Sequence, residues 1–81
     1  MTHHAALWAA VNRIAEINNI SCSCLARKCK LDASTFNRSK HFSTCGQPRW
    51  ITTETLAKVL IATHTSPIEF ARILQDFLDK E

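Results

Sequence analysis

The residues between positions 27 and 49 combine positive charges with small polar side chains, a set suited to binding an anionic polymer. Six of the ten Lys and Arg residues lie there with a single acid, Asp32, so the segment carries a charge of +5 while the rest of the chain sums to −2. A run of bases is often only a solvated surface. Because this distribution is so one-sided, it favours an anionic partner, and we expect nucleic acid.

The four cysteines could in principle bind a metal or form disulfides. Cys22, Cys24, Cys29 and Cys45 contain no C-x-x-C pair, and the nearest candidate histidine is His41. On a helix over 22–29, Cys22 and Cys24 would point about 200° apart, and Cys22 and Cys29 would lie roughly 10 Å apart along the axis. We therefore expect no metal and no cofactor, with Cys29 as a small buried hydrophobe and the other cysteines as reduced thiols.

The histidines give no sign of catalysis. His3, His4, His41 and His64 lie in separate segments, and no nucleophile, base and orienting group are recognisable around them. We expect His3 and His4 to be surface residues in the first turn of a helix. The sequence therefore predicts that the protein is not an enzyme.

Length and composition predict one small all-α domain over residues 1–81. The chain is 46% hydrophobic, with one Gly, two Pro and no Tyr, which suits helices joined by short connections. Folding a chain of this size buries only about 60% of its surface, so dimerisation would add useful stability. No apolar run approaches the ~20 residues of a membrane span, and the N-terminus lacks the basic start of a signal peptide. We expect a cytoplasmic protein with no membrane partner.

Apolar periodicity and capping residues predict five helices, at about 3–18, 22–29, 33–40, 53–63 and 67–79. Thr2, Ser21 or Ser23, Asp32 and Thr52 are suitable N-caps for the first four. The first helix should end near Asn18 or Asn19, because Asn tolerates the left-handed conformation. The segment from His41 to Ile51 contains Gly46 and Pro48, so an irregular loop is expected there.

The last helix has the clearest start signal, a capping box with proline at the first helical position over Ser66-Pro67-Ile68-Glu69. Its apolar stripe spans more than three turns and must be core for at least part of its width. The extra width at the end makes a dimer contact through Phe77 and Leu78 possible.

The predicted helices 22–29 and 33–40, joined by only a few residues, would form a helix-turn-helix. The segment LARKCKLDASTFNRSK, from Leu25 to Lys40, resembles that motif in the XRE, or lambda-repressor-like, family of DNA-binding domains, and the resemblance covers about residues 5–78. The segments TFNRSK, PRW and TTETLAKVL are similar to a bacterial branch in which this domain precedes a LexA-like peptidase domain. The parent chain could therefore carry a C-terminal peptidase-like domain.

The resemblance implies a compact five-helix lambda-repressor-like domain with the helix-turn-helix at helices 2 and 3. It implies sequence-specific binding of double-stranded DNA by a transcriptional regulator, as a repressor. Such a protein reads a two-fold operator as a homodimer, with half-sites about 34 Å apart, by placing helix 33–40 in the major groove.

Helix geometry assigns roles to the polar side chains. With Phe36 facing inward, the outer side of helix 33–40 would meet base edges, and Asn37 and Arg38 have the chemistry to pair with adenine and guanine. The expected base-reading residues are Ala33, Ser34, Thr35, Asn37 and Arg38. The expected phosphate-binding residues are Ser21, Cys22, Ser23, Arg27, Lys28, Lys40, Arg49 and Trp50.

Lys30 departs from the family's pattern, because it occupies the turn position where the family usually has Gly. A residue with a Cβ in the left-handed conformation costs about 1 kcal/mol. We therefore expect either a strained turn or a shifted geometry there.

A second reading stays open at this level: an antitoxin-like or other protein-interaction module that uses the C-terminal helix. Such a module would not need positive charge on residues 33–49, so this charge favours the DNA-binding reading.

Overall fold

The protein folds into four α-helices and one short 3₁₀ helix within residues 1–80, which the computed structural model describes. The elements are α1 (His3–Ile17), α2 (Cys22–Lys28), η1 (Arg38–Lys40), α3 (Thr53–Ala62) and α4 (Pro67–Leu78). The α-helices fall within one residue of four of the predicted helices. The fold is a small all-α fold, but the prediction of five helices is wrong. None of the described helices is long and apolar enough to cross a membrane.

Each α-helix begins directly after a hydroxyl residue that caps it. The side-chain oxygen of each cap accepts the backbone N–H three residues later at 3.1 Å; the four caps are Thr2, Ser21, Thr52 and Ser66. Glu69 accepts the backbone N–H of Ser66 at 3.2 Å, which completes the expected capping box. These hydrogen bonds explain why the helix starts could be predicted so closely.

Three helices end in a left-handed residue that is not glycine. Asn19, Lys30 and His64 have φ values of 57°, 58° and 53°. In each case the next residue donates its N–H to the carbonyl five residues earlier, at 2.9 to 3.1 Å, which is the Schellman arrangement. Of the two alternatives expected at Lys30, the structure therefore has the left-handed turn and not a shifted geometry.

Replacing Lys30 by glycine should stabilise the protein, because glycine removes the Cβ clash at φ 58°. We expect Lys30→Gly to raise the free energy of unfolding by up to about 1 kcal/mol, less the extra entropy of glycine in the unfolded chain. Lys28→Gly is the matched control: it removes the same charge from an α-helical residue and should lower that free energy by about 0.5–1 kcal/mol. Urea denaturation of both variants measures the difference, and a loss of stability in Lys30→Gly would contradict a strained turn.

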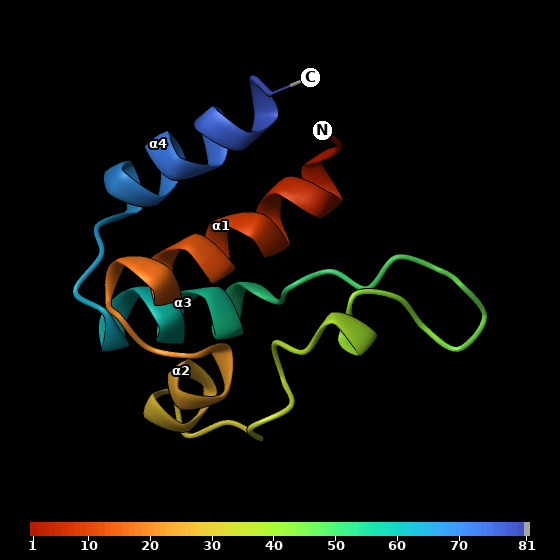
Figure 1. The fold of residues 1–81 in the computed structure, drawn as a ribbon, viewed down its shortest axis with the longest axis horizontal. Coiled ribbons are helices and arrows are strands. Elements are labelled where there is room, and N and C mark those ends of the chain that lie inside the picture. The colour runs from red at the N-terminus through yellow and green to blue at the C-terminus, as the bar shows by residue number, and fades with distance from the viewer. Residues whose placement is uncertain (81) are drawn as a thin grey trace.

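Helix α1 is the central element of the fold. It lies antiparallel to α4 on one side and contacts α2 on the other, so that both chain termini lie at the same end of this helix pair (Figure 1). The Met1 ammonium donates to the Lys80 carbonyl at 3.1 Å. Val11 and Ile14 of α1, Leu25 of α2 and Val59 of α3 are the largest fully buried side chains.

The predicted helix at 33–40 is not formed, so a helix-turn-helix at helices 2 and 3 and the five-helix lambda-repressor-like domain are wrong for this chain. The Asp32 carboxylate accepts hydrogen bonds from the backbone N–H and the hydroxyl of Ser34, at 2.8 and 2.6 Å. The backbone carbonyl of Asp32 accepts hydrogen bonds from the backbone N–H and the hydroxyl of Thr35, at 3.0 and 2.6 Å. Ser and Thr compete with helical hydrogen bonding in this way. Asn37 is then extended, with φ −65° and ψ 147°, which ends the turn before η1 begins.

Residues 41–49 form a loop without regular strands, as expected, and a single bridge closes its two arms into a hairpin shape. Phe42 and Pro48 pair as an antiparallel bridge, and the N–H of Arg49 donates to the His41 carbonyl at 2.9 Å. Gly46, with φ 82°, closes the turn at the tip. We call this segment the hairpin. It extends away from the four α-helices (Figure 1).

Candidate nucleic-acid interface

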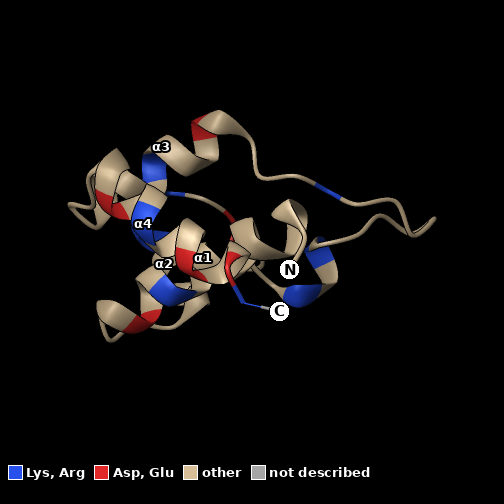
Figure 2. Ribbon diagram, turned by 90° about the horizontal axis from the view of Figure 1, so that it is seen from above, with Lys and Arg blue, Asp and Glu red and all other residues tan. Residues whose placement is uncertain are grey.

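Residues 33–53 carry no acid, and they place three cations on one side of the molecule. These cations are Arg38, Lys40 and Arg49. Lys and Arg occur without Asp or Glu along η1 and the hairpin, whereas α4 carries both signs (Figure 2). Within residues 1–80 the only ion pairs are Arg13–Glu16 and Lys58–Glu54. The three cations are therefore not neutralised by neighbouring acids in the described part of the chain.

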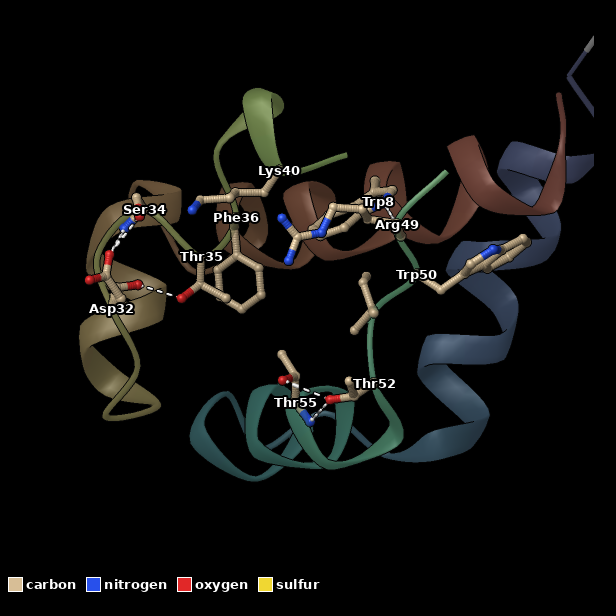
Figure 3. Close-up of a pocket in the computed structure, with 11 residues that line it drawn as sticks. Trp8, Asp32, Ser34, Thr35, Phe36, Lys40, Arg49, Trp50, Thr52 and Thr55 are labelled. Atoms are coloured by element: carbon tan, nitrogen blue, oxygen red, sulfur yellow. Dashed lines mark hydrogen bonds between the residues drawn. The ribbon is translucent and has the colours of Figure 1, made fainter. Parts of the chain in front are cut away.

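Lys40 and Arg49 line a cavity of about 390 Å³ between the turn at 32–36, the segment 49–52 and the start of α3 (Figure 3). Both side chains lie along one rim of this cavity, above Phe36. Phe36 lies below them, Trp8 lies beside Arg49, and Thr52 and Thr55 line the opposite side at the start of α3 (Figure 3). A cavity with two free cations on one rim suits an anionic oxygen group such as a phosphate.

The hydroxyl groups in this cavity are mostly occupied within the protein. The hydrogens of Ser34 and Thr35 are donated to Asp32, and Thr52 donates to Thr55 at 3.0 Å. The Thr55 hydroxyl accepts that bond, so its own hydrogen is free to donate. The hydrogen bonds from Ser34, and the charge of Lys40, lower the pKa of Asp32, so this carboxylate stays ionised at neutral pH. An anion would therefore bind at the Lys40–Arg49 end, away from Asp32.

The structure divides the residues that were expected to read bases. Ser34 and Thr35 line the cavity with Lys40 and Arg49, whereas Asn37 and Arg38 are exposed and border a second cavity of about 630 Å³ against α1. Ala33 is half-buried and lines neither cavity. Without the helix there is no common outer face, and Asn37 and Arg38 are the members that can reach a partner most directly.

The expected phosphate ligands on α2 lie apart from this cavity. Ser21 caps the helix, and Ser23 is half-buried beside it. The Cys22 thiol donates to Asn12 at 2.9 Å, and burial, together with the charge of Glu16, raises the pKa of Cys22. Arg27 and Lys28 are exposed in the last turn of α2, where cations also offset the helix dipole.

The cysteines are free thiols in different environments. Cys29 is 6% exposed and belongs to the hydrophobic core, so its expected packing role is confirmed, and burial raises its pKa. Cys22 and Cys24 are half-buried and Cys45 is exposed. Among residues 1–80 no group of three His, Cys, Asp or Glu residues is arranged to hold a metal ion.

The base of the hairpin is fixed by two residues of α1 that the sequence reading missed. The Nε2 of His4 lies 2.8 Å from the His41 carbonyl and 3.1 Å from the Arg49 carbonyl, so this nitrogen carries a hydrogen and donates to both ends of the hairpin. Trp8 donates its indole N–H to the Arg49 carbonyl at 3.0 Å. The expectation that His4 lies on the surface is wrong, since it is buried. The one available signal was the spacing of His4 and Trp8, one helical turn apart.

Aromatic contacts extend this anchor. The Trp8 ring stacks on His41 with centroids 4.2 Å apart, and His4 contacts the rings of Phe42 and Trp50 at 5.0 and 5.4 Å. Trp50 is 57% exposed, and its ring points away from the other residues of the cavity (Figure 3). Trp50, an expected phosphate ligand, therefore packs against His4 at the hairpin base and still has exposed surface that could contact a partner.

The stacked His41 should make stability depend on pH. Burial, followed by the charges of His4 and Arg38, lowers the pKa of His41 below its ordinary 6.5. Because the unfolded chain then binds the proton more tightly, the stability from neutral His41 is present above about pH 6.5 and lost as the pH falls toward the folded pKa. Urea denaturation at about pH 5.5 and 7.5 should show this loss. His41→Phe, which keeps a ring against Trp8, should reduce it, and an identical pH dependence in both proteins would contradict the assignment.

The expected dimer contact is only partly available. Phe77 is half-buried against the core, and the Lys80 ammonium lies 4.7 Å from its ring centroid. Leu78 is half-buried outside the core cluster. Ile61 and Ile68, which were not expected at a contact, are 75% and 68% exposed.

The candidate interface thus consists of the cavity rim of Lys40 and Arg49, the exposed pair Asn37 and Arg38, and the hairpin anchored on α1. It combines unneutralised cations with polar groups that can hydrogen-bond, and it contains no acid beyond Asp32 at its edge. No protein-family model matches the chain, and no curated protein or solved structure matches it either.

Proposed function

We propose that the protein binds double-stranded DNA in a sequence-specific manner and acts in the cytoplasm as a transcriptional regulator, as a repressor. The observation that carries this proposal is the acid-free segment 33–53, which has three cations outside any ion pair of the described residues, two of them, Lys40 and Arg49, lining one cavity. An anionic polymer is the partner that such a surface attracts most strongly.

The proposed contacts with DNA are of two kinds, contacts to the phosphate backbone and contacts to the base edges. Lys40 and Arg49 on the cavity rim, with the Thr55 hydroxyl, suit one backbone phosphate, and this contact would set the position of the protein without reading sequence. Asn37 and Arg38 are exposed beside it and can pair with adenine and guanine edges. Because Asn37 and Arg38 lie on an extended residue and a 3₁₀ turn, they would enter the groove from a loop rather than from a helix face.

The operator would be two-fold symmetric if two copies associate. The apolar residues that a second copy could cover are Leu78 on α4 and the exposed Ile61 and Ile68. A dimer would place two acid-free segments on one duplex, with half-sites separated by about 34 Å.

A salt titration tests the proposal. Fluorescence anisotropy with a labelled random duplex should show binding whose log affinity falls with log salt concentration, with a slope of about −3 if the three cations of segment 33–53 each replace one counterion. Contacts from Arg27 and Lys28 would steepen that slope. Affinity that is absent at low salt, or equal at about 50 and 200 mM, would contradict DNA binding.

The exposed Ile68 of α4, with Ile61 at the end of α3, also favours a second candidate function, an antitoxin-like or other protein-interaction module that docks through α4. Their exposure is high for large apolar side chains. This function predicts a chain that binds a protein partner but shows no salt-dependent affinity for DNA, so the same titration distinguishes the two.

A further inference from the structure

The hairpin is an ordered protrusion. Ser43 organises its tip: the Ser43 N–H donates to the Gln47 carbonyl at 2.8 Å, and the Ser43 hydroxyl accepts the N–H groups of Cys45 and Gln47 at 3.3 and 3.1 Å. The N–H of Gly46 donates to the Ser43 carbonyl at 2.9 Å. The protrusion extends clear of the helices (Figure 1). Its tip therefore has a defined shape before any partner binds.

The base of the hairpin is held from α1. His4 donates to the carbonyls of His41 and Arg49, and Trp8 donates to the Arg49 carbonyl. One face of α1 therefore fixes both ends of the hairpin. His4 is also the only buried polar or charged side chain among the described residues. Two adjacent turns of the central helix are thus used to hold a segment whose tip adds nothing to the core.

The tip offers hydrogen-bonding groups to solvent and nothing else. All residues from 44 to 50 are exposed, and Cys45 does not belong to the hydrophobic core cluster. The amide of Gln47 has no hydrogen-bond partner among residues 1–80, whereas its backbone is fixed by Ser43. A rigid scaffold that presents free polar groups on a loop is the arrangement expected of a binding element.

The width of the hairpin and the cations beside it fit the major groove of DNA better than the minor groove. The two arms of the hairpin meet at one antiparallel bridge, where paired backbones lie about 5 Å apart, and with side chains the width is roughly that of the DNA major groove, about 12 Å, whereas the minor groove is only about 6 Å wide. Arg38 and Lys40 lie in η1, which directly precedes the hairpin, and Arg49 is the last hairpin residue, so cations occur at both ends of this segment. With the tip in the groove, these cations would face the phosphates along its edges.

We infer that the hairpin at 41–49 enters the major groove of duplex DNA and that Gln47, with Thr44 beside it, contacts base edges there. The inference rests on the proposed function, and it names the hairpin as the segment that contacts the bases. A glutamine amide can donate to N7 and accept from N6 of adenine, which gives two hydrogen bonds to one base. The cations at the base hold the backbone, and the tip supplies sequence preference.

The test uses the duplex recovered by in vitro selection with the full chain, and a random duplex. Gln47→Ala should weaken binding to the selected duplex about 10- to 100-fold and leave the random duplex nearly unchanged. Gln47→Glu should weaken both, because it places an acid in the groove. Gln75→Glu on α4 is the matched control and should leave both affinities within about twofold.

Base analogues locate the contact. Replacing the adenines of the selected duplex one at a time by 7-deazaadenine removes the N7 acceptor of the major groove only. At one position this replacement should lower the affinity of the wild-type protein for the duplex about tenfold. It should not lower the affinity of the Gln47→Ala variant any further. Wild-type affinity for DNA together with unchanged binding by both Gln47 variants would overturn the hairpin assignment alone. A wild-type chain that binds no duplex at low salt would overturn the proposed function and the hairpin with it.

Discussion

Trp8→Ala is expected to lower the free energy of unfolding by about 3–5 kcal/mol, the largest single effect on stability that we predict. The Trp8 ring is 8% exposed, stacks on His41 and donates to the Arg49 carbonyl at 3.0 Å. Its removal leaves a cavity in the core and releases the base of the hairpin. Since domains of this size are stabilised by only about 5–15 kcal/mol, the variant should be close to unfolding at room temperature.

Trp8→Phe separates the two roles of this side chain. It keeps a six-membered ring in the core but removes the indole N–H and three ring atoms, so it should cost about 1–1.5 kcal/mol for the hydrogen bond in addition to the cost of the smaller ring, and less in total than Trp8→Ala. Urea denaturation followed by circular dichroism measures both variants. The anchor described at the hairpin base would be wrong if Trp8→Ala cost less than about 1 kcal/mol.

Lys40→Ala and Arg49→Ala should give the largest losses of DNA affinity on all sequences alike. Each removes one cation from the cavity rim, and Arg49→Ala leaves the backbone bonds of the hairpin in place. Each variant should bind about tenfold or more weakly at low salt and reduce the salt slope by about 0.9, and the double variant by about 1.8.

Arg72→Ala is the control for net charge. Arg72 is an exposed residue of α4, outside the acid-free segment, so its loss changes the total charge equally. Its salt slope should stay at the wild-type value. Equal losses in Arg72→Ala and the rim variants would show that overall charge, and not the cavity rim, determines binding.

The helix starts could be predicted because their causes are local. Each cap is a hydroxyl that binds the N–H three residues later, and the pattern is visible in the sequence at Thr2, Ser21, Thr52 and Ser66. At Lys30 the comparison with the XRE motif left a strained turn or a shifted geometry open, and the structure has the left-handed turn.

The predicted helix at 33–40 is wrong because the side-chain hydrogen bonds that start helices elsewhere in the chain stabilise a turn here. Asp32 is a good cap, but Ser34 and Thr35 bind it with side chain and backbone together, which closes a turn in place of a helix. Phe36 is buried as expected, so the apolar position was identified correctly and the secondary structure around it was not. One apolar anchor in eight residues gives little periodicity to decide between the two.

The hairpin anchor was out of reach of sequence reading for a different reason. His4 and Trp8 meet their partners 37 to 45 residues later in the chain, and nothing local in either segment indicates that pairing. The positive charge of residues 27–49 was evident from the sequence. Its arrangement around a cavity and a hairpin needed the folded structure.

In vitro selection from a random duplex library is the most direct test of the central claim, sequence-specific DNA binding through the acid-free segment 33–53. The full chain should enrich one motif, repeated with two-fold symmetry at a spacing of about 34 Å if two copies bind together. The Gln47→Ala variant should enrich a motif degenerate at one base pair. A library that stays random after repeated rounds with the wild-type chain would contradict the claim.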